Sequence, residues 1–124
     1  MRGVQAVLDR LRSAYDVQGV CVMDRHGRVL RAEVPKSVNI PAFSVMVSSI
    51  FEAAQNIGEE FRKAPPRRIE IRMPEGDVII AAAGPHHLLA VILGTWDAPA
   101  FSREVDRAAR QLHHALPEVG EAAG

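Results

Sequence analysis

The chain has 124 residues, 48% of them hydrophobic, and its 15 basic and 15 acidic side chains cancel to a net charge of zero. This length indicates one domain with a real hydrophobic core. The balanced charge argues against a general attraction to nucleic acid or to a membrane surface.

Three further features of the sequence concern its compartment. The single cysteine, Cys21, excludes an internal disulfide and is typical of a reducing cytoplasm. No apolar run approaches the roughly 18 residues of a membrane span, and the N-terminus lacks the pattern of a signal peptide. We therefore expect a cytoplasmic protein with neither nucleic acid nor a membrane as a partner.

The chain opens with an amphipathic helix, which Gly19 ends, and continues into a hairpin. The helix stripe that we expect to be buried consists of Val4, Val7, Leu8, Leu11 and Tyr15. Residues 20–23 form a strand that is apolar on both faces, and Asp24 and Gly27 have the chemistry of a tight turn. In the return strand, residues 28–34, we expect Leu30, Ala32 and Val34 on one face and Val29, Arg31 and Glu33 on the other.

The longest apolar-periodic segment is residues 41–61, which Asn39 is expected to cap and Pro41 to open. At about 100° per residue one stripe gathers six residues that we expect to face the core, namely Phe43, Val47, Ile50, Ala54, Ile57 and Phe61. A neighbouring strip is also small or apolar and consists of Ala42, Met46, Ser49 and Ala53. A helix so apolar is normally covered on more than one side. The second strip therefore indicates a partner chain, the alternative being a helix buried at the centre of one large domain.

The second half of the chain contains three strands and a last helix. A basic segment, Arg62, Lys63, Arg67 and Arg68, is more simply a solvated linker than a nucleic-acid site. Residues 69–73 alternate apolar with charged side chains, whereas residues 78–83 and 88–93 are apolar throughout. The helix stripe that follows consists of Phe101, Val105, Ala108, Ala109, Leu112 and Leu116. We place the domain at residues 1–117 and a flexible tail at residues 118–124.

The character of the strands predicts the sheet. Strands that are apolar on both faces belong inside a sheet, and strands with a charged face belong at its edges. Together with the hairpins, this gives an α+β fold with a single five-stranded antiparallel sheet in the order 2-1-5-4-3. The long helix covers one face and the two terminal helices the other. One helix about 10 Å across cannot cover five strands spaced about 4.8 Å apart, which is a second indication of a partner.

The sequence contains no recognisable catalytic or cofactor motif. A phosphate-binding Gly-rich loop and a Gly-x-Ser-x-Gly elbow are both absent. Cys21 lies in an apolar strand, where a thiol acts as a small hydrophobe, and Asp24 is a turn former rather than a general base. His86-His87 and His113-His114 lack a third ligand at metal-binding spacing, and we place the first pair in a turn and the second on a helix surface. We therefore expect no catalytic residue, no metal and no cofactor.

The order and spacing of all eight elements resemble the roadblock / dynein light chain superfamily. The likeness is carried by the opening helix, by residues 19–30, by the long helix, and by the strands at residues 69–71, 78–80 and 88–91. Such a resemblance implies a profilin-like α/β/α sandwich and a non-catalytic dimer whose long helices pack together and whose third strands pair across a two-fold axis. It also implies a regulator or scaffold of a small Ras-like GTPase, with or without stimulation of GTP hydrolysis.

Two surfaces follow from this resemblance and from the second strip. The expected homodimer interface consists of Met46, Ser49, Ile50, Ala53, Ile69 and Ile71. The expected GTPase footprint lies at the start of the long helix and consists of Lys36, Asn39, Ala42 and Phe43. A profilin-like or PAS-like small-molecule sensor and, third, an enzyme remain as alternatives. Apolar surface on the outside of the helix would favour a protein partner, and apolar surface around an internal cavity would favour a ligand.

Overall fold

The structure is a computed structural model that describes residues 2–13, 16–94 and 98–116. The elements in chain order are α1 (Arg2–Ser13), β1 (Val17–Asp24), β2 (Val29–Glu33), α2 (Ile40–Glu60), β3 (Arg68–Met73), β4 (Gly76–Ala82), β5 (His87–Leu93) and α3 (Ala98–Ala115). The strands form one antiparallel sheet in the order β2-β1-β5-β4-β3, which confirms the predicted topology. Tyr15 and the predicted tail at residues 118–124 lie outside the described residues.

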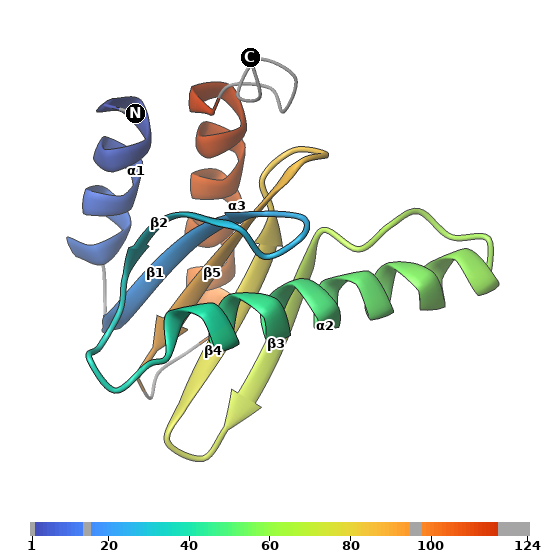
Figure 1. Cartoon of the computed structure of the whole chain (residues 1–124), viewed down its shortest axis with the longest axis horizontal. Helices are drawn as coiled ribbons and strands as arrows, with labels where there is room; N and C mark the ends of the chain where they lie inside the picture. Colours follow the sequence, from blue (N-terminus) through green and yellow to red (C-terminus); the bar gives the residue numbers. More distant parts are fainter. Residues whose placement is uncertain (1, 14–15, 95–97, 117–124) are drawn as a thin grey trace.

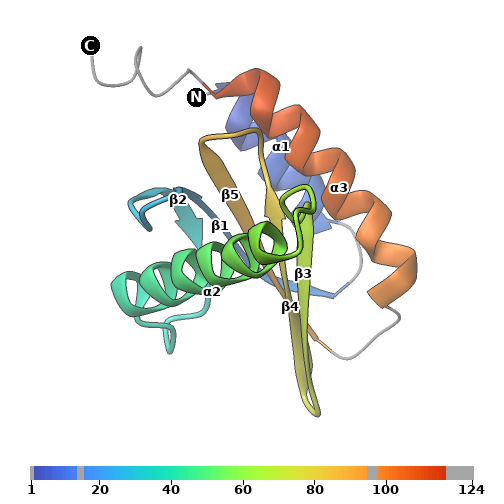
Figure 2. The same ribbon diagram turned by 90° about the vertical axis from the view of Figure 1, so that its right-hand side faces the viewer.

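The sheet is the middle layer of three. Figures 1 and 2 show α2 on one face and α1 with α3 on the other. The three inner strands supply both cores because successive side chains point to opposite faces. In β1, for example, Val20 and Val22 pack in the cluster under α1 and α3, whereas Cys21 and Met23 pack under α2. The predicted stripe of α3 is buried as expected.

The face assignment predicted for β2 is wrong at two residues, Val29 and Leu30. Leu30 packs in the cluster under α1 and α3, while Val29 and Ala32 pack in the cluster under α2. The pairing register shifts between Val22, opposite Arg31, and Met23, opposite Val29. Leu30 is thus the extra residue of a β-bulge, and such a residue reverses the alternation of faces.

The core face predicted for α2 is only partly correct: Val47 is buried and Phe43 packs against the cluster under α2, but the helix is rotated about its axis relative to the prediction. Its buried residues are Ser44, Val47, Ser48 and Phe51. Ile57 and Phe61, which were assigned to the core, are 61% and 70% exposed. The two buried serines are accommodated because their hydroxyl groups donate to backbone carbonyls, Ser44 to Pro41 at 3.2 Å and Ser48 to Arg25 at 2.6 Å.

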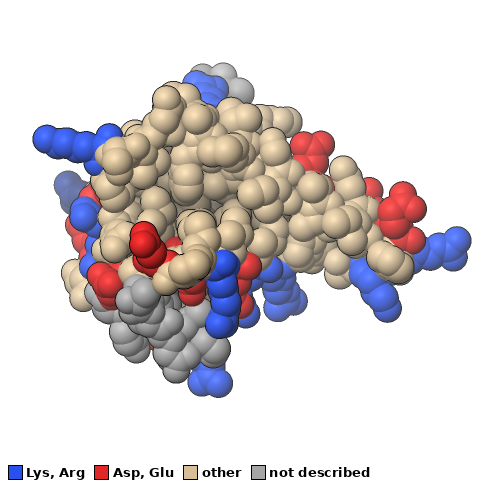
Figure 3. Space-filling model, turned by 90° about the horizontal axis from the view of Figure 1, so that it is seen from below, with Lys and Arg blue, Asp and Glu red and all other residues tan. Residues whose placement is uncertain are grey.

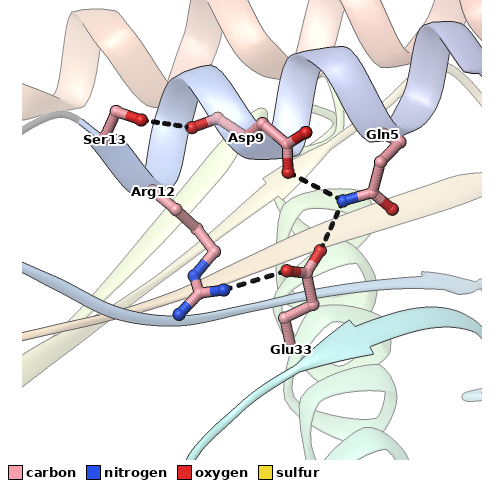
Figure 4. Close-up of polar contacts among 5 residues, drawn as sticks. All are labelled: Gln5, Asp9, Arg12, Ser13 and Glu33. Carbon is pink, nitrogen blue, oxygen red and sulfur yellow. Dashed lines mark hydrogen bonds and ion pairs between the residues drawn. The ribbon is translucent and has the colours of Figure 1, made fainter.

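A polar cluster holds α1 against the edge strand β2 (Figure 4). Gln5 Nε2 donates to Glu33 Oε2 and to Asp9 Oδ1, each at 2.8 Å, and Arg12 Nη1 donates to Glu33 Oε1 at 2.9 Å. On the same face at the opposite edge, Arg68 pairs with Asp106 of α3. The layer of α1 and α3 is therefore fastened to both edges of the sheet, whereas the single helix α2 covers the other face.

Candidate functional site

An exposed apolar surface lies on the side of the sheet that α2 covers. The large side chains that contribute to it are Met46, Ile50 and Ile57 of α2, Phe61 after it, and Met73 of β3. Figure 3 shows a broad uncharged region that continues to the right along the projecting end of α2, with charged side chains at its border. Exposed apolar area of this extent is typical of a protein interface. None of the helices that the structure describes is long and apolar enough to cross a membrane.

The predicted interface residues lie on this side of the sheet. Met46, Ser49, Ile50 and Ala53 are exposed on α2, with Met46 57% exposed. Ile69 and Ile71 of β3 are half-buried and pack against the cluster beneath α2. The structure therefore brings the helix and strand parts of the set onto one face. Whether a second chain binds them stays a prediction.

The geometry of α2 and β3 leaves this surface open at the sheet edge. Among the described strands β3 pairs with β4 alone, so its outer edge carries backbone N–H and C=O groups without strand partners. The C-terminal half of α2 extends past this edge (Figure 1). Ile57 on this part of α2 and Phe61 directly after it are exposed.

Only some residues of the predicted GTPase footprint are exposed and have no structural role in the fold. Lys36 and Ala42 are exposed, but Phe43 is half-buried and packs against the cluster beneath α2. Asn39 has a structural role as the N-cap of α2, and its Oδ1 accepts from the backbone N–H of Ala42 at 3.0 Å. The four residues do lie together at the start of α2.

The turn between β1 and β2 is bound to α2 by a residue that the sequence analysis did not single out. The guanidinium of Arg25 lies 4.6 Å from the ring centroid of Phe51, and its Nη2 donates to Gln55 Oε1 at 2.6 Å. Burial lowers the pKa of Arg25. No sequence signal indicates this contact, because a turn arginine has no periodic relation to a helix that begins 15 residues later. The turn itself has the predicted form, since Asp24 Oδ1 accepts from the backbone N–H groups of His26 and Arg28.

Cys21 and His87 are titratable groups that the structure places in the core. Burial raises the pKa of the Cys21 thiol to about 11, so the thiol is protonated at neutral pH, as expected of a structural residue. The prediction that His87 lies in a turn is wrong, because His87 is the buried first residue of β5. His113 and His114 are exposed on α3, as predicted. Across the described ranges, no three His, Cys, Asp or Glu side chains are grouped to hold a metal.

We expect the stability of the fold to fall on acidification because of His87. Burial, more than the neighbouring His86 and His113, lowers the pKa of His87 from 6.5, while Asp24 acts in the opposite sense. Below pH 6.5 the unfolded chain therefore binds a proton that the folded chain does not, and stability decreases until the lowered pKa is passed. Urea denaturation between pH 7.5 and pH 5 should show this loss.

A His87→Leu variant, compared with the exposed His114→Gln, identifies the group responsible. The loss on acidification should shrink in His87→Leu and persist in His114→Gln. An unchanged pH profile in His87→Leu would assign the effect to another group.

The chain is similar to a known family in sequence and to known proteins in fold. The family model described as Roadblock/LC7 domain matches residues 3–93, and a search of curated proteins found no match. MglB of Myxococcus xanthus superposes with a TM-score of 0.84 at 13% identity, covering 90% of this chain and 93% of that one. The gliding protein MglB of Thermus thermophilus gives a TM-score of 0.83 at 19% identity, covering 91% of this chain and 87% of that one.

A further solved structure carries the name "MglB with tetrameric arrangement". It superposes with a TM-score of 0.82 at 22% identity, covering 91% of this chain and 86% of that one. At these identities the likeness concerns the fold, whereas the family model extends over most of the chain. The chain belongs to the Roadblock/LC7 domain family.

Proposed function

We propose that this chain is a non-catalytic regulator or scaffold that associates with a second copy of itself and binds a small Ras-like GTPase. The observation that carries the proposal is the exposed apolar surface of α2 and β3, where large side chains such as Met46 and Met73 are about half exposed. This apolar surplus lies on the outside of the fold, which favours a protein partner over the small-molecule sensor. Membership of the Roadblock/LC7 family and the resemblance of the sequence to GTPase regulators support the same function.

Self-association is supported by three features that meet at one edge. The outer edge of β3 can accept a strand, the projecting half of α2 has no sheet of its own beneath it (Figure 1), and Ser49 and Ala53 are small enough to let two helices approach closely. A two-fold axis along the β3 edge would place the projecting helix of each copy over the sheet of the other. The MglB structure named for its tetrameric arrangement gives a related fold that associates with itself.

The absence of a catalytic motif in the sequence is compatible with regulation of a GTPase. GTP hydrolysis is accelerated mainly by positioning and by electrostatic stabilisation of the transferring phosphoryl group. A protein surface can supply both effects by ordering the switch segments of the GTPase, without a nucleophile, a base or a metal of its own. The dimer would then contribute no catalytic side chain, or at most one positioned arginine.

We place the GTPase footprint at the N-terminal end of α2 and the loop before it. Residues toward the middle of α2, such as Met46 and Ala53, cannot serve the dimer interface and the GTPase equally. Lys36 and Ala42 are exposed at the helix start. One GTPase bound across the two-fold axis gives a 2:1 complex, and one bound to each outer end gives 2:2.

Calorimetric titration with a small Ras-like GTPase from the same organism tests the proposal. We expect binding in the presence of a non-hydrolysable GTP analogue and weaker binding with GDP, because a regulator must distinguish the two switch conformations. Ala42→Arg should weaken binding at least tenfold through its bulk, while Arg103→Glu, exposed on α3, should leave it unchanged. Equal affinity for the two nucleotide states of the GTPase would support a scaffold and not a regulator. No binding to the GTPase would favour the small-molecule sensor.

A further inference from the structure

An open groove of about 740 Å³ lies on the part of the molecule where α2, the loop after it, the β4–β5 turn and α3 come together. Arg25 and Gln55 line it from the side of α2, Arg67 from the loop, and Arg110 from α3. We call it the arginine groove. Its volume falls within the range of about 300–1,000 Å³ that small-molecule sites occupy.

The lining of the arginine groove carries an excess of positive charge. Arg25, Arg67 and Arg110 face a single lining carboxylate among the described residues, that of Asp106. This carboxylate is already paired with Arg68, whose Nη1 lies 2.5 Å from Asp106 Oδ2. In the described part of the chain, Arg67 and Arg110 form no ion pair. The arginines therefore come from three separate elements, and the one carboxylate that they face is already paired with Arg68.

One of these arginines is held in place before any ligand arrives. Arg25 is stacked on Phe51 and bonded to Gln55, and burial lowers its pKa. A partly desolvated guanidinium gains more from an anion than a solvated one does. A guanidinium also matches phosphate and carboxylate oxygens in pairs. The groove thus contains a positioned anion-binding group at the end nearest α2.

The rest of the lining is apolar and stiff. Pro65, Pro66 and Pro85 form much of it, together with Ala64 and Ala109. Proline has a fixed φ and no backbone N–H, so these walls offer flat contact area and few hydrogen-bond donors. An inorganic ion would leave them uncovered, whereas an organic body would fill them.

The arginine groove is separate from the expected dimer interface. Gln55 follows Met46 by nine positions, which at about 100° per residue places the two on opposite sides of α2. Met46 is exposed on the outer side, and Gln55 lines the groove. A ligand and a second chain can therefore occupy the two sides of α2 at the same time.

We infer that the arginine groove binds a small organic anion that carries at least two negative charges, as phosphate or carboxylate groups, on an apolar or planar body. The charge would lie between Arg25, Arg67 and Arg110, and the body against the prolines. The concave shape favours a small molecule over an acidic protein segment. This inference goes beyond the proposed function and does not depend on it.

Calorimetric titration of the purified full chain with AMP, adenosine, pyrophosphate and citrate, in about 150 mM salt, tests the inference. AMP should bind and adenosine should not, because charge is required, and AMP should bind more tightly than pyrophosphate, because the organic body adds contact. Binding of citrate would show that the groove accepts carboxylate groups, and binding of AMP without citrate would show that it requires phosphate. Arg67→Gln and Arg110→Gln should each weaken binding about tenfold or more, as expected for a charge-assisted contact.

Arg103→Gln is the matched control, since Arg103 is an exposed arginine of α3 that does not line the groove. Circular dichroism should show the same fold in all three variants. The inference is overturned if Arg103→Gln weakens binding as much as Arg110→Gln, or if no probe binds more tightly than about 1 mM. Binding of an acidic peptide through Arg67 and Arg110, without binding of any small anion, would also overturn it in favour of a protein partner.

Discussion

Ala53→Arg is expected to convert the proposed homodimer into a monomer. Ala53 is exposed on the outer side of α2 in the single chain, where an arginine costs little. In a helix-to-helix interface the same arginine would be buried without a partner, at a cost of several kcal/mol. Such a cost corresponds to a rise of at least about 100-fold in the dimer dissociation constant. Light scattering should give about twice the chain mass for the unaltered protein at micromolar concentration, and the chain mass for the variant.

Glu52→Arg is a matched control because it introduces the same side chain one position earlier. Glu52 is exposed as well, but it lies about 100° away around the helix, outside the strip of Met46, Ser49 and Ala53. We expect this variant to remain a dimer. If both variants kept the original dissociation constant, the interface would not lie on α2, and a monodisperse monomer of the unaltered chain would remove the dimer altogether.

Phe51→Ala is expected to cost about 3–5 kcal/mol of folding free energy, the range for a fully buried phenylalanine. Phe51 is 1% exposed and packs between α2 and the sheet. Its ring also lies beneath the guanidinium of Arg25, so the truncation removes a contact that holds the β1–β2 turn against α2. Urea denaturation measures the loss.

Phe61→Ala provides the contrast, because the apolar periodicity of the sequence assigned this phenylalanine to the core. Phe61 is 70% exposed, and its truncation should change the stability of the single chain by about 0.5 kcal/mol or less. Measurement at two protein concentrations separates the stability of the chain from that of the dimer, since only the latter depends on concentration. Equal losses in the two variants would mean that the rotation of α2 described above is wrong.

The order of the strands could be predicted because it depends on which faces are apolar. β1, β4 and β5 are apolar on both faces and must lie inside the sheet, while Arg68, Glu70 and Arg72 mark β3 as an edge. The bulge at Leu30 could not be predicted in this way. An inserted residue changes the pairing without changing the composition of the strand.

The rotation of α2 could not be predicted from the sequence, for a different reason. Periodicity identifies the most apolar stripe of a helix, but the buried residues of α2 share only Val47 with the stripe expected from the sequence. Ser44 and Ser48 count against the true core face in any hydrophobic pattern. They are buried because the carbonyls of Pro41 and Arg25 accept their hydroxyl protons, and the second of these carbonyls comes from a distant turn.

The candidate interface stays a prediction, but the strip on which it rests is exposed as the sequence suggested. A strip of small and apolar residues stands out from sequence alone, and Met46, Ser49 and Ala53 are exposed in the structure. The arginine groove could not be foreseen, because Arg25, Arg67 and Arg110 meet only through the tertiary packing of three elements.

The burial of Cys21 makes the protein suitable for spectroscopic labelling without prior removal of its own thiol. Cys21 is the single cysteine of the chain, and burial together with a pKa of about 11 keeps its sulfur protonated and shielded from reagents. A cysteine introduced on an exposed side chain of α2 would then be the one reactive thiol in each protomer. A spin label or fluorophore attached there would report the separation between the two copies of the proposed dimer directly in solution.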